Sequence, residues 1–375
     1  MKKLMSIAIS LVLVLGIFLT GCAKSSEGTS GSSSNGTAKK LKIAFLYVGP
    51  VGDGGYTYAH DQGRKYLEQQ LGDKVETTYK ENVAEDDAVV QQVCEDMINN
   101  GAKVIIGTSY GFMEGMKKSA EAHSDIKYLH CSGYELTDNM GNYFGRDYQA
   151  RYLAGIVAGM KTKTNKIGYV AAMPIAECIR GINAFTLGVQ SVNKDAVVKV
   201  TWTNTWLDPA KEKDAAKALI AQGVDVIAQH QDSTGPQQAA EEAGIWSIGY
   251  NSDMGKAAPK ANMTNVIWNW GPYYVDQAKK ILDGTWKAES YFGAIDSDDS
   301  KSILSLTKLT ENAPAGAQAA IDKAKADILS GKNKVFVGPI YDNQGNLKVK
   351  EGEVMSDHDM LNFDWFVKGV DGKVK

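Results

Sequence analysis

The chain has 375 residues, of which 23% are charged, and its formal net charge at pH 7 is −3. This slightly acidic balance argues against a nucleic-acid partner, because such a partner calls for a basic face. About 335 residues remain once a leader and a polar segment are set aside, more than one hydrophobic core usually holds, so two lobes are predicted.

The N-terminal segment, residues 1–22, has the pattern of an export signal. Lys2 and Lys3 precede the apolar run 7–19, and small residues then lead directly to Cys22. This arrangement resembles a bacterial lipobox, in which the cysteine is acylated and becomes the mature N-terminus. The apolar run is shorter than the roughly 20 residues that a spanning helix needs. We therefore expect a lipid anchor on Cys22 rather than a membrane helix.

Residues 23–39 are dominated by Ser and Gly and contain almost no apolar side chains. Such a segment buries too little surface to offset the entropy of ordering, so we expect a flexible tether. No later stretch is long and apolar enough to cross a bilayer. The sequence thus predicts a folded body held at the cell membrane, on its extracytoplasmic side.

The first part of the body alternates strand-like apolar runs with helical patterns. The run 41–48 is typical of a buried strand, and the Gly/Pro-rich loop VGPVGDGG follows its end. A second series of the same kind begins near residue 166. The expected strands are 41–48, 75–79, 104–107, 128–131, 142–145, 166–170, 197–202, 224–228 and 246–250, and the expected helices include 58–70, 86–99, one that carries Met116, and 150–160.

Two consecutive βαβ series imply two parallel sheets with helices on both faces, joined by a hinge. Ligands of such sheets bind outside the carboxyl ends of the strands, and with two lobes those ends can face each other across a cleft. We assign residues 40–146 and about 250–290 to lobe 1, and residues 147–249 and about 291–375 to lobe 2. Hinge strands are expected near Gly145, Tyr250 and Asn269, and lobe closure around the ligand is the expected mechanism.

The tail is less regular. A helix is predicted over 313–329 with Asn312 as its cap, and a turn at 342–346 leads into a hairpin that closes with Trp365 and Phe366. Cys94, Cys131 and Cys178 are widely spaced in apolar surroundings, which favours buried thiols over a disulfide or a metal site.

Several segments together resemble a known family. They are the lipobox, KIAFLYVGPVGDGGYTYAHDQG, NYFGRDYQARYLAGIVAG, QDSTGPQQAAEEAG, GYNSDM and GPIYDNQGN. In this order and spacing they resemble the basic-membrane-protein family of solute-binding lipoproteins, which includes purine nucleoside receptors. The resemblance runs from Leu41 to about Met355. It implies a type I periplasmic-binding-protein fold and a partner permease of an ABC importer.

The resemblance also implies a site. Nucleoside-binding members hold the purine between two aromatic side chains, and the matching positions here are Tyr56 and Trp206. Two departures concern the neighbouring polar positions. Where the family usually has an acid, in a G-x-D-x-D-Q segment, this chain has Asn251, and where it usually has a lysine this chain has Trp268. Loss of charge and added bulk favour a free purine base, adenine first, over a nucleoside.

A purine needs hydrogen bonds along its edge, because stacking contributes about 1–3 kcal/mol per base without telling one purine from another. Asp232 follows a buried strand; an ionised carboxylate there would accept from an amino group or ring N–H. Alternatively, Asp232 caps the helix that starts near Thr234. Asn251 can donate and accept, which suits the paired edge of adenine. Further candidates by loop position are Ser109, Tyr110, Thr57 and Asp253.

Features of an enzyme are missing from the sequence. The histidines have no metal-ligand spacing, and neither a G-x-S-x-G elbow nor a Walker loop occurs, so we expect no metal, no cofactor and no catalysis. A nucleoside hydrolase would want an Asp cluster near the first strand, and residues 39–43 offer none. A monomeric binding protein is predicted; a purine nucleoside receptor for adenosine, guanosine or inosine, or a sensor for a sugar or other small solute, remains the alternative.

Overall fold

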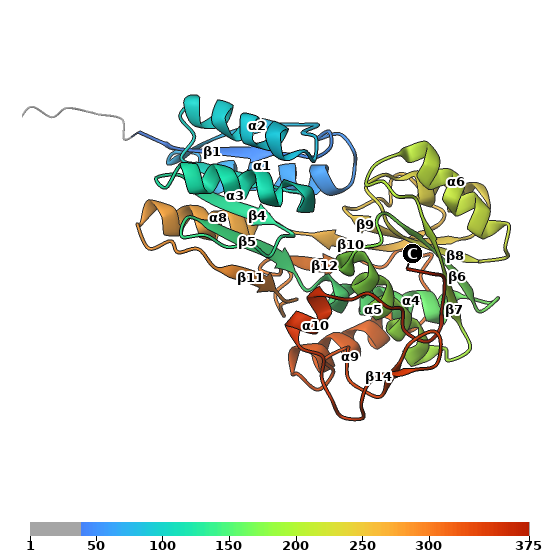
Figure 1. Ribbon diagram of the computed structural model, residues 1–375. Helices are drawn as coiled ribbons and strands as arrows, with labels where there is room; N and C mark the ends of the chain where they lie inside the picture. Colours follow the sequence, from blue (N-terminus) through green and yellow to red (C-terminus); the bar gives the residue numbers. More distant parts are fainter. Residues whose placement is uncertain (1–38, 375) are drawn as a thin grey trace, which may run out of the picture. The chain divides into compact units, whose positions relative to one another are not determined.

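A computed structural model describes residues 39–374, so the leader, Cys22 and residues 23–38 of the predicted tether lie outside the described residues. Within that range the chain forms two α/β lobes (Figure 1). None of the helices between residues 39 and 374 has the length and apolar character needed to span a membrane.

Lobe 1 is built on a six-stranded sheet in the order β11-β5-β4-β3-β1-β2, in which every pairing is parallel. Along β1, Ile43 and Phe45 belong to one buried cluster while Ala44 and Leu46 belong to another, so both faces of the sheet are covered. The strands are β1 (Leu41–Leu46), β2 (Val75–Lys80), β3 (Val104–Gly107), β4 (Lys127–Cys131), β5 (Met140–Gly145) and β11 (Ser290–Gly293), and the helices are α1 (Tyr56–Leu71), α2 (Asp87–Asn99), α3 (Met113–Ala122) and α8 (Gly271–Leu282), with a 3₁₀ turn at Tyr110–Phe112.

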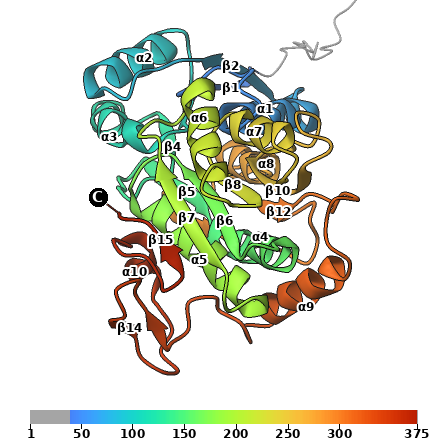
Figure 2. The ribbon, with the colours of Figure 1, turned by 90° about the vertical axis from the view of Figure 1, so that its right-hand side faces the viewer.

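Lobe 2 is built on a seven-stranded sheet in the order β12-β10-β9-β8-β6-β7-β15, in which only β12 is antiparallel to its neighbour. Figure 2 shows α4 and α5 together on one side of it and α6 and α7 on the other. The strands are β6 (Lys166–Ala171), β7 (Val197–Trp202), β8 (Val226–His230), β9 (Trp246–Asn251), β10 (Asn262–Trp268), β12 (Leu304–Leu306) and β15 (Val370–Asp371), and the helices are α4 (Asp147–Lys161), α5 (Ala176–Val192), α6 (Pro209–Ile220) and α7 (Gly235–Glu242).

The boundaries predicted between the lobes need correction. Residues 250–268 were assigned to lobe 1, but β10 pairs with β9 and both belong to the second sheet. The polar residues Asn262, Thr264 and Asn265 interrupt the apolar pattern of β10, and the strand was therefore not predicted. Conversely, β11 belongs to the sheet of lobe 1 rather than lobe 2.

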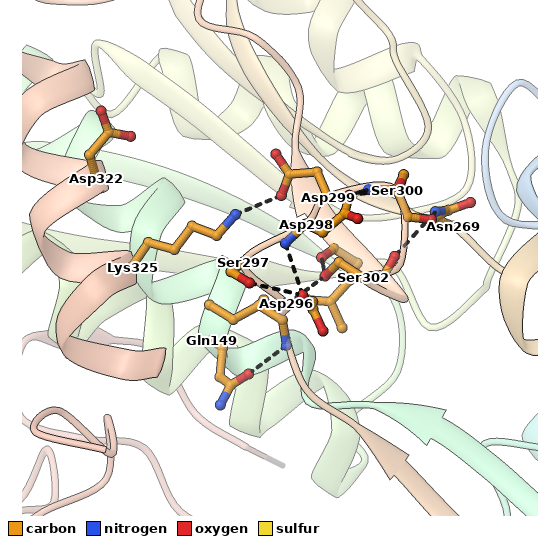
Figure 3. Close-up of polar contacts among 12 residues, drawn as sticks. Gln149, Asn269, Asp296, Ser297, Asp298, Asp299, Ser300, Ser302, Asp322 and Lys325 are labelled. Carbon is orange, nitrogen blue, oxygen red and sulfur yellow. Dashed lines mark hydrogen bonds and ion pairs between the residues drawn. The ribbon is translucent and has the colours of Figure 1, made fainter. Parts of the chain in front are cut away.

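The chain crosses between the lobes after β5, after β10 and again between β11 and β12. The first and second crossings lie next to Gly145 and Asn269, as predicted, whereas Tyr250 lies inside β9 and is not a crossing. Figure 3 shows the polar contacts of the third crossing, residues 294–303. Lys325 of α9 (Ala317–Leu329) pairs with Asp299 at 2.6 Å, and the side-chain oxygen of Gln149 accepts from the backbone of Ile295 at 3.0 Å.

The C-terminal region returns to lobe 2. The helix α9 starts four residues later than predicted, and Asn312 does not cap it, because its amide donates instead to the carbonyls of Pro259 and Asn262. A hairpin of β13 (Ile340–Tyr341) and β14 (Leu347–Val349) follows, then α10 (Asp357–Leu361). The final strand, β15, pairs in parallel with the edge strand β7.

Candidate ligand-binding site

A cavity lies where loops from the two lobes meet. Its lining residues follow the carboxyl ends of strands, which is where open parallel sheets bind ligands. Lobe 1 contributes Val48, Tyr56, Ser109, Tyr110 and Ser132, and lobe 2 contributes Glu177, Trp206, His230, Asp232 and Tyr250.

The loop after β1 positions Tyr56. The carboxylate of Asp53 accepts hydrogen bonds from the backbone N–H groups of Gly55, Thr57 and Tyr58 at 2.8–2.9 Å, and this starts α1 two residues earlier than predicted. The hydroxyl of Tyr56 donates to the thiol of Cys131 at 3.4 Å. Its ring therefore has a fixed place in the cavity wall.

Thr57, in contrast, is turned away from the cavity. Its side chain is fully buried, and its hydroxyl oxygen accepts from the backbone N–H of Gly49 at 3.2 Å. Thr57 was predicted to contact the ligand, but it does not line the cavity. Its hydroxyl instead ties the start of α1 to Gly49 in the preceding loop.

Trp206 lies on the lobe 2 side of the cavity within an aromatic cluster. Its ring centroid is 6.4 Å from that of His230, which in turn lies 4.6 Å from Tyr250. The guanidinium of the buried Arg151 lies 3.5 Å from the centroid of Tyr250 and supports that ring from behind. Both aromatic residues predicted for stacking, Tyr56 and Trp206, thus line one cavity from opposite lobes.

At one end of the cavity stands Asp232, held by two residues behind it. Its Oδ1 accepts from the amide of Asn251 at 2.9 Å, and the amide oxygen of Asn251 accepts from the indole N–H of Trp268 at 3.1 Å. Asn251 and Trp268 do not line the cavity. The prediction that Asn251 contacts the purine edge directly is therefore corrected: its amide is engaged with protein and positions Asp232.

Asp232 does not cap the following helix, since no side chain caps α7 and the acid is bonded to Asn251 instead. Burial raises the pKa of Asp232 well above its ordinary value, and the nearby carboxylates of Asp53 and Glu212 add to this rise. The sequence interpretation assumed an ionised acceptor. A neutral carboxylic acid can instead donate one hydrogen bond and accept others.

The three remaining predicted residues, Ser109, Tyr110 and Asp253, do not share one position. Ser109 and Tyr110 line the cavity, but the Ser109 hydroxyl already donates to Glu85, while Tyr110 is 38% exposed at the rim. Asp253 is exposed outside the cavity, where its carboxylate accepts from Gly255 and Asn265. Its predicted ligand contact is therefore corrected to a role in the turn after β9.

A second acid in the cavity wall is Glu177, in the first turn of α5. One carboxylate oxygen accepts from the hydroxyl of Ser132 in lobe 1, and the other lies 3.5 Å from Nε2 of His230. Burial raises the pKa of Glu177, but its contacts with His230 and Ser132 and the charge of Arg180 outweigh burial and lower it overall. Burial lowers the pKa of His230, so Glu177 is the anion and His230 is neutral.

The sequence interpretation missed half of the lining residues. A stricter use of the strand-end rule could have found four of them, because they lie within two residues of the carboxyl end of a strand, whereas Glu177 lies in the first turn of the helix after β6. The missed residues are Val48, Ser132, Glu177, His230 and Tyr250.

Among residues 39–374, no group of three or more His, Cys, Asp and Glu side chains is placed to hold a metal ion. Cys94, Cys131 and Cys178 are free and buried, as predicted. The chemistry of the cavity is thus that of aromatic surfaces and two carboxyl groups whose pKa values are shifted in opposite directions.

Residues 40–301 match the family described as ABC transporter substrate-binding protein, PnrA-like. The chain belongs to this family. A purine-binding protein of Brucella abortus is 43% identical to it over 96% of this chain and 98% of its own length. A putative ABC transporter glucose-binding protein of Haloferax volcanii is 37% identical over 95% of this chain and 85% of its own length.

Solved structures of solute-binding proteins share the fold. One from Aeropyrum pernix K1 superposes with a TM-score of 0.68 at 19% identity, covering 80% of this chain and 93% of its own. One from Conexibacter woesei gives 0.64 at 21% identity, covering 78% and 97%. The predicted type I fold is confirmed. Family membership also makes the chain a binding protein rather than an enzyme, working on the extracytoplasmic side.

Proposed function

We propose that this protein captures a purine base, adenine first, in the cavity between its lobes and delivers it to an ABC importer. The observation that carries the proposal is the pairing of Tyr56 and Trp206 from opposite lobes on one small cavity. Flat aromatic ligands gain about 1–3 kcal/mol from each stacked ring. The name of the Brucella relative, a purine-binding protein, agrees with this chemistry.

A base is favoured over a nucleoside because bulky side chains fill the space next to Asp232. Trp268 stacks on Trp270 with ring centroids 4.5 Å apart and contacts Phe144 at 4.9 Å, so the indole is held rigidly in place. Asn251 is fully buried between this indole and Asp232. Neither of these residues offers a charged group to ribose hydroxyls.

Adenine also suits the protonation of the acid. A neutral Asp232 can donate its O–H to a ring nitrogen while its other oxygen accepts from an amino group. Adenine presents such an acceptor and donor side by side on one edge. Oδ1 of Asp232 accepts from Asn251 and keeps a second lone pair, so both oxygens can take part in such a pair of hydrogen bonds.

A sugar is the competing ligand, and the name of the Haloferax relative makes it specific: glucose. Two carboxyl groups and an aromatic wall would also suit a hexose. We propose further that Cys22 carries the lipid anchor, that closure is a rotation of the lobes about the crossings near Gly145, Asn269 and residues 294–303, and that the closed form docks on the permease.

The test is calorimetric titration of a protein that begins at residue 38, unfolded and refolded to remove carried ligand. Adenine, adenosine and glucose are compared at one pH. We expect adenine to bind at least about tenfold more tightly than adenosine, because Asn251 and Trp268 stand where the family usually has an acid and a lysine, and no charged group is left there for ribose hydroxyls. Tighter binding of adenosine would mean that the sugar space is open, and binding of glucose alone would replace the proposed function.

A further inference from the structure

We propose that Glu177 recognises a hydrogen-bond donor on the ligand and, through Ser132 of the other lobe, links that recognition to closure of the cavity. This inference rests on the proposed function and deepens it. It predicts that the ligand edge facing Glu177 carries an N–H group, and that an edge without a donor is rejected.

The position of Glu177 between the lobes is the first support. Glu177 begins α5 in lobe 2, whereas Ser132 follows β4 in lobe 1, so the hydrogen bond between them crosses the cavity. Both residues line the cavity wall. A ligand that donates a hydrogen bond to Glu177 would therefore contact the same carboxylate that joins the two lobes.

The unused capacity of the carboxylate is the second support. An ionised carboxylate offers about four acceptor positions, and Ser132 fills one of them. The contact with Nε2 of His230, at 3.5 Å, is longer than an ordinary hydrogen bond. Within the described part of the chain, no lysine or arginine nitrogen lies within 4.0 Å of Glu177.

The open acceptor positions of the Glu177 carboxylate can still accept from a donor on a ligand. Two buried arginines contact other groups: Arg180 lies 3.6 Å from Asp147 and donates to the carbonyl of Met360, and Arg151 donates to the carbonyl of Gln229. The side chain of Glu177 is 13% exposed, and that exposure is toward the cavity it lines. A ligand N–H is the donor that this arrangement lacks.

Glu177 and Ser132 also line a second, wider hollow, whose wall includes Tyr134, Phe144 and Leu361. A methyl group on the ligand edge at Glu177 would point toward this hollow, so we expect its cost to come from the lost hydrogen bond to Glu177 rather than from crowding.

The experiment is a thermodynamic cycle that compares the effect of ligand methylation on affinity in the wild type with the same effect in a Glu177 variant. Adenine, 9-methyladenine and 6-dimethylaminopurine are titrated into the wild type and into Glu177→Ala by calorimetry. For the wild type we expect one of the two methylated ligands to bind about 10- to 150-fold more weakly than adenine, because a hydrogen bond to a charged group is lost. In Glu177→Ala the same methylation should cost at most about twofold.

Glu177→Gln provides the conservative variant, and it carries the cycle if Glu177→Ala does not fold, as judged by circular dichroism. Glu85→Gln is the matched control, because Glu85 also accepts from a serine hydroxyl, that of Ser109, but entirely within lobe 1. Small-angle scattering with and without adenine reports closure, which we expect to be diminished in Glu177→Ala and in Ser132→Ala and unchanged in Glu85→Gln.

Three outcomes distinguish the possibilities. A methylation penalty that vanishes with Glu177 supports the inference. Penalties for both methylated ligands that persist unchanged in the Glu177 variants overturn it while leaving purine binding in place. If the wild type binds no purine at all, the proposed function fails at the first titration and the inference fails with it.

Discussion

The two ends of the cavity bring the lobes together in different ways. At the Asp232 end, backbone meets backbone: a Cβ atom on Gly55 of lobe 1 would lie 2.0 Å from the carbonyl oxygen of Asp232 in lobe 2. At the Glu177 end, the lobes meet through one side-chain hydrogen bond from Ser132. Close packing of the two backbones therefore controls closure near Asp232, whereas a hydrogen bond can control closure near Glu177.

The two acids, Asp232 and Glu177, also differ in the direction of their pKa shifts. Burial raises the pKa of Asp232 well above its ordinary value, whereas the contacts of Glu177 with His230 and Ser132 lower the pKa of that acid. A ligand between them meets a group that can donate at one end and a pure acceptor at the other. The comparison indicates that orientation of the ligand, and not only its size, is specified by the cavity. The following predictions test this difference.

The largest effect is expected from Gly55→Ala. The added methyl group would overlap the backbone of Asp232, which no side-chain rotation can relieve, so the closed form should be lost and adenine affinity should fall by about 100-fold or more. Gly52→Ala, in the same loop, is the control, because a Cβ there meets nothing within 4 Å. Calorimetry measures the affinity of each variant for adenine. Thermal unfolding of the ligand-free variants shows whether the loop itself is destabilised. Equal affinity of the two variants would refute steric closure.

Trp206→Ala should weaken adenine binding by about 10- to 100-fold, the loss of one stacking surface. The indole is half-buried and its backbone carbonyl accepts from the N–H of Asp232 at 3.3 Å, a contact that the alanine variant keeps. The protein should therefore remain folded by circular dichroism. Undiminished affinity in a folded variant would show that Trp206 does not stack on the ligand.

Opposite pH dependences are expected from the two carboxyl groups. The pKa of Asp232 is raised by folding, so the wild type loses stability as the pH rises from the unfolded value near 3.8 through the higher folded value. Asp232→Asn removes this loss and should raise the melting temperature of the ligand-free protein at pH 8 by about 2–4 °C. Identical melting temperatures at pH 8 would contradict a neutral Asp232.

The pKa of Glu177 is lowered by folding, so its stabilising contribution is present above the unfolded value near 4.5 and is lost as the pH falls through the folded value. Glu177→Gln should melt below the wild type at pH 7, and the difference should disappear in acid. A difference that instead grows with acidity would mean that Glu177 is not held as an anion.

The smallest effect is expected from Ser252→Ala. The hydroxyl of Ser252 in lobe 2 donates to the carbonyl of Gly54 in lobe 1, a second interlobe bond near the Asp232 end. Since close packing already determines that end, removing one neutral hydrogen bond should reduce adenine affinity by only about two- to tenfold. A loss as large as that of Gly55→Ala would show that hydrogen bonding, and not shape, closes this end.

The sequence predicted the elements of the fold well and the directions of side chains poorly. Apolar strands were located within two residues of their observed bounds, whereas β10 was missed because its core positions include buried amides. Asp232 was placed on the cavity by the end of its strand, and Tyr56 and Trp206 by the family resemblance; all three line it. Asn251 was not, because it adopts a left-handed backbone (φ 70°) whose side chain turns to Asp232, which no local pattern indicates.

The pairing of β15 with β7 has a practical consequence for any shortened form of the protein. Residues Val370 and Asp371 cover Val198 and Lys199 on what is otherwise the outer strand of the lobe 2 sheet. Removing the last few residues would leave the hydrogen-bonding groups of β7 unpaired, and open strand edges of this kind invite aggregation. The C-terminus, which lies beyond the segment that matches the family, should therefore be kept for the protein to stay monodisperse.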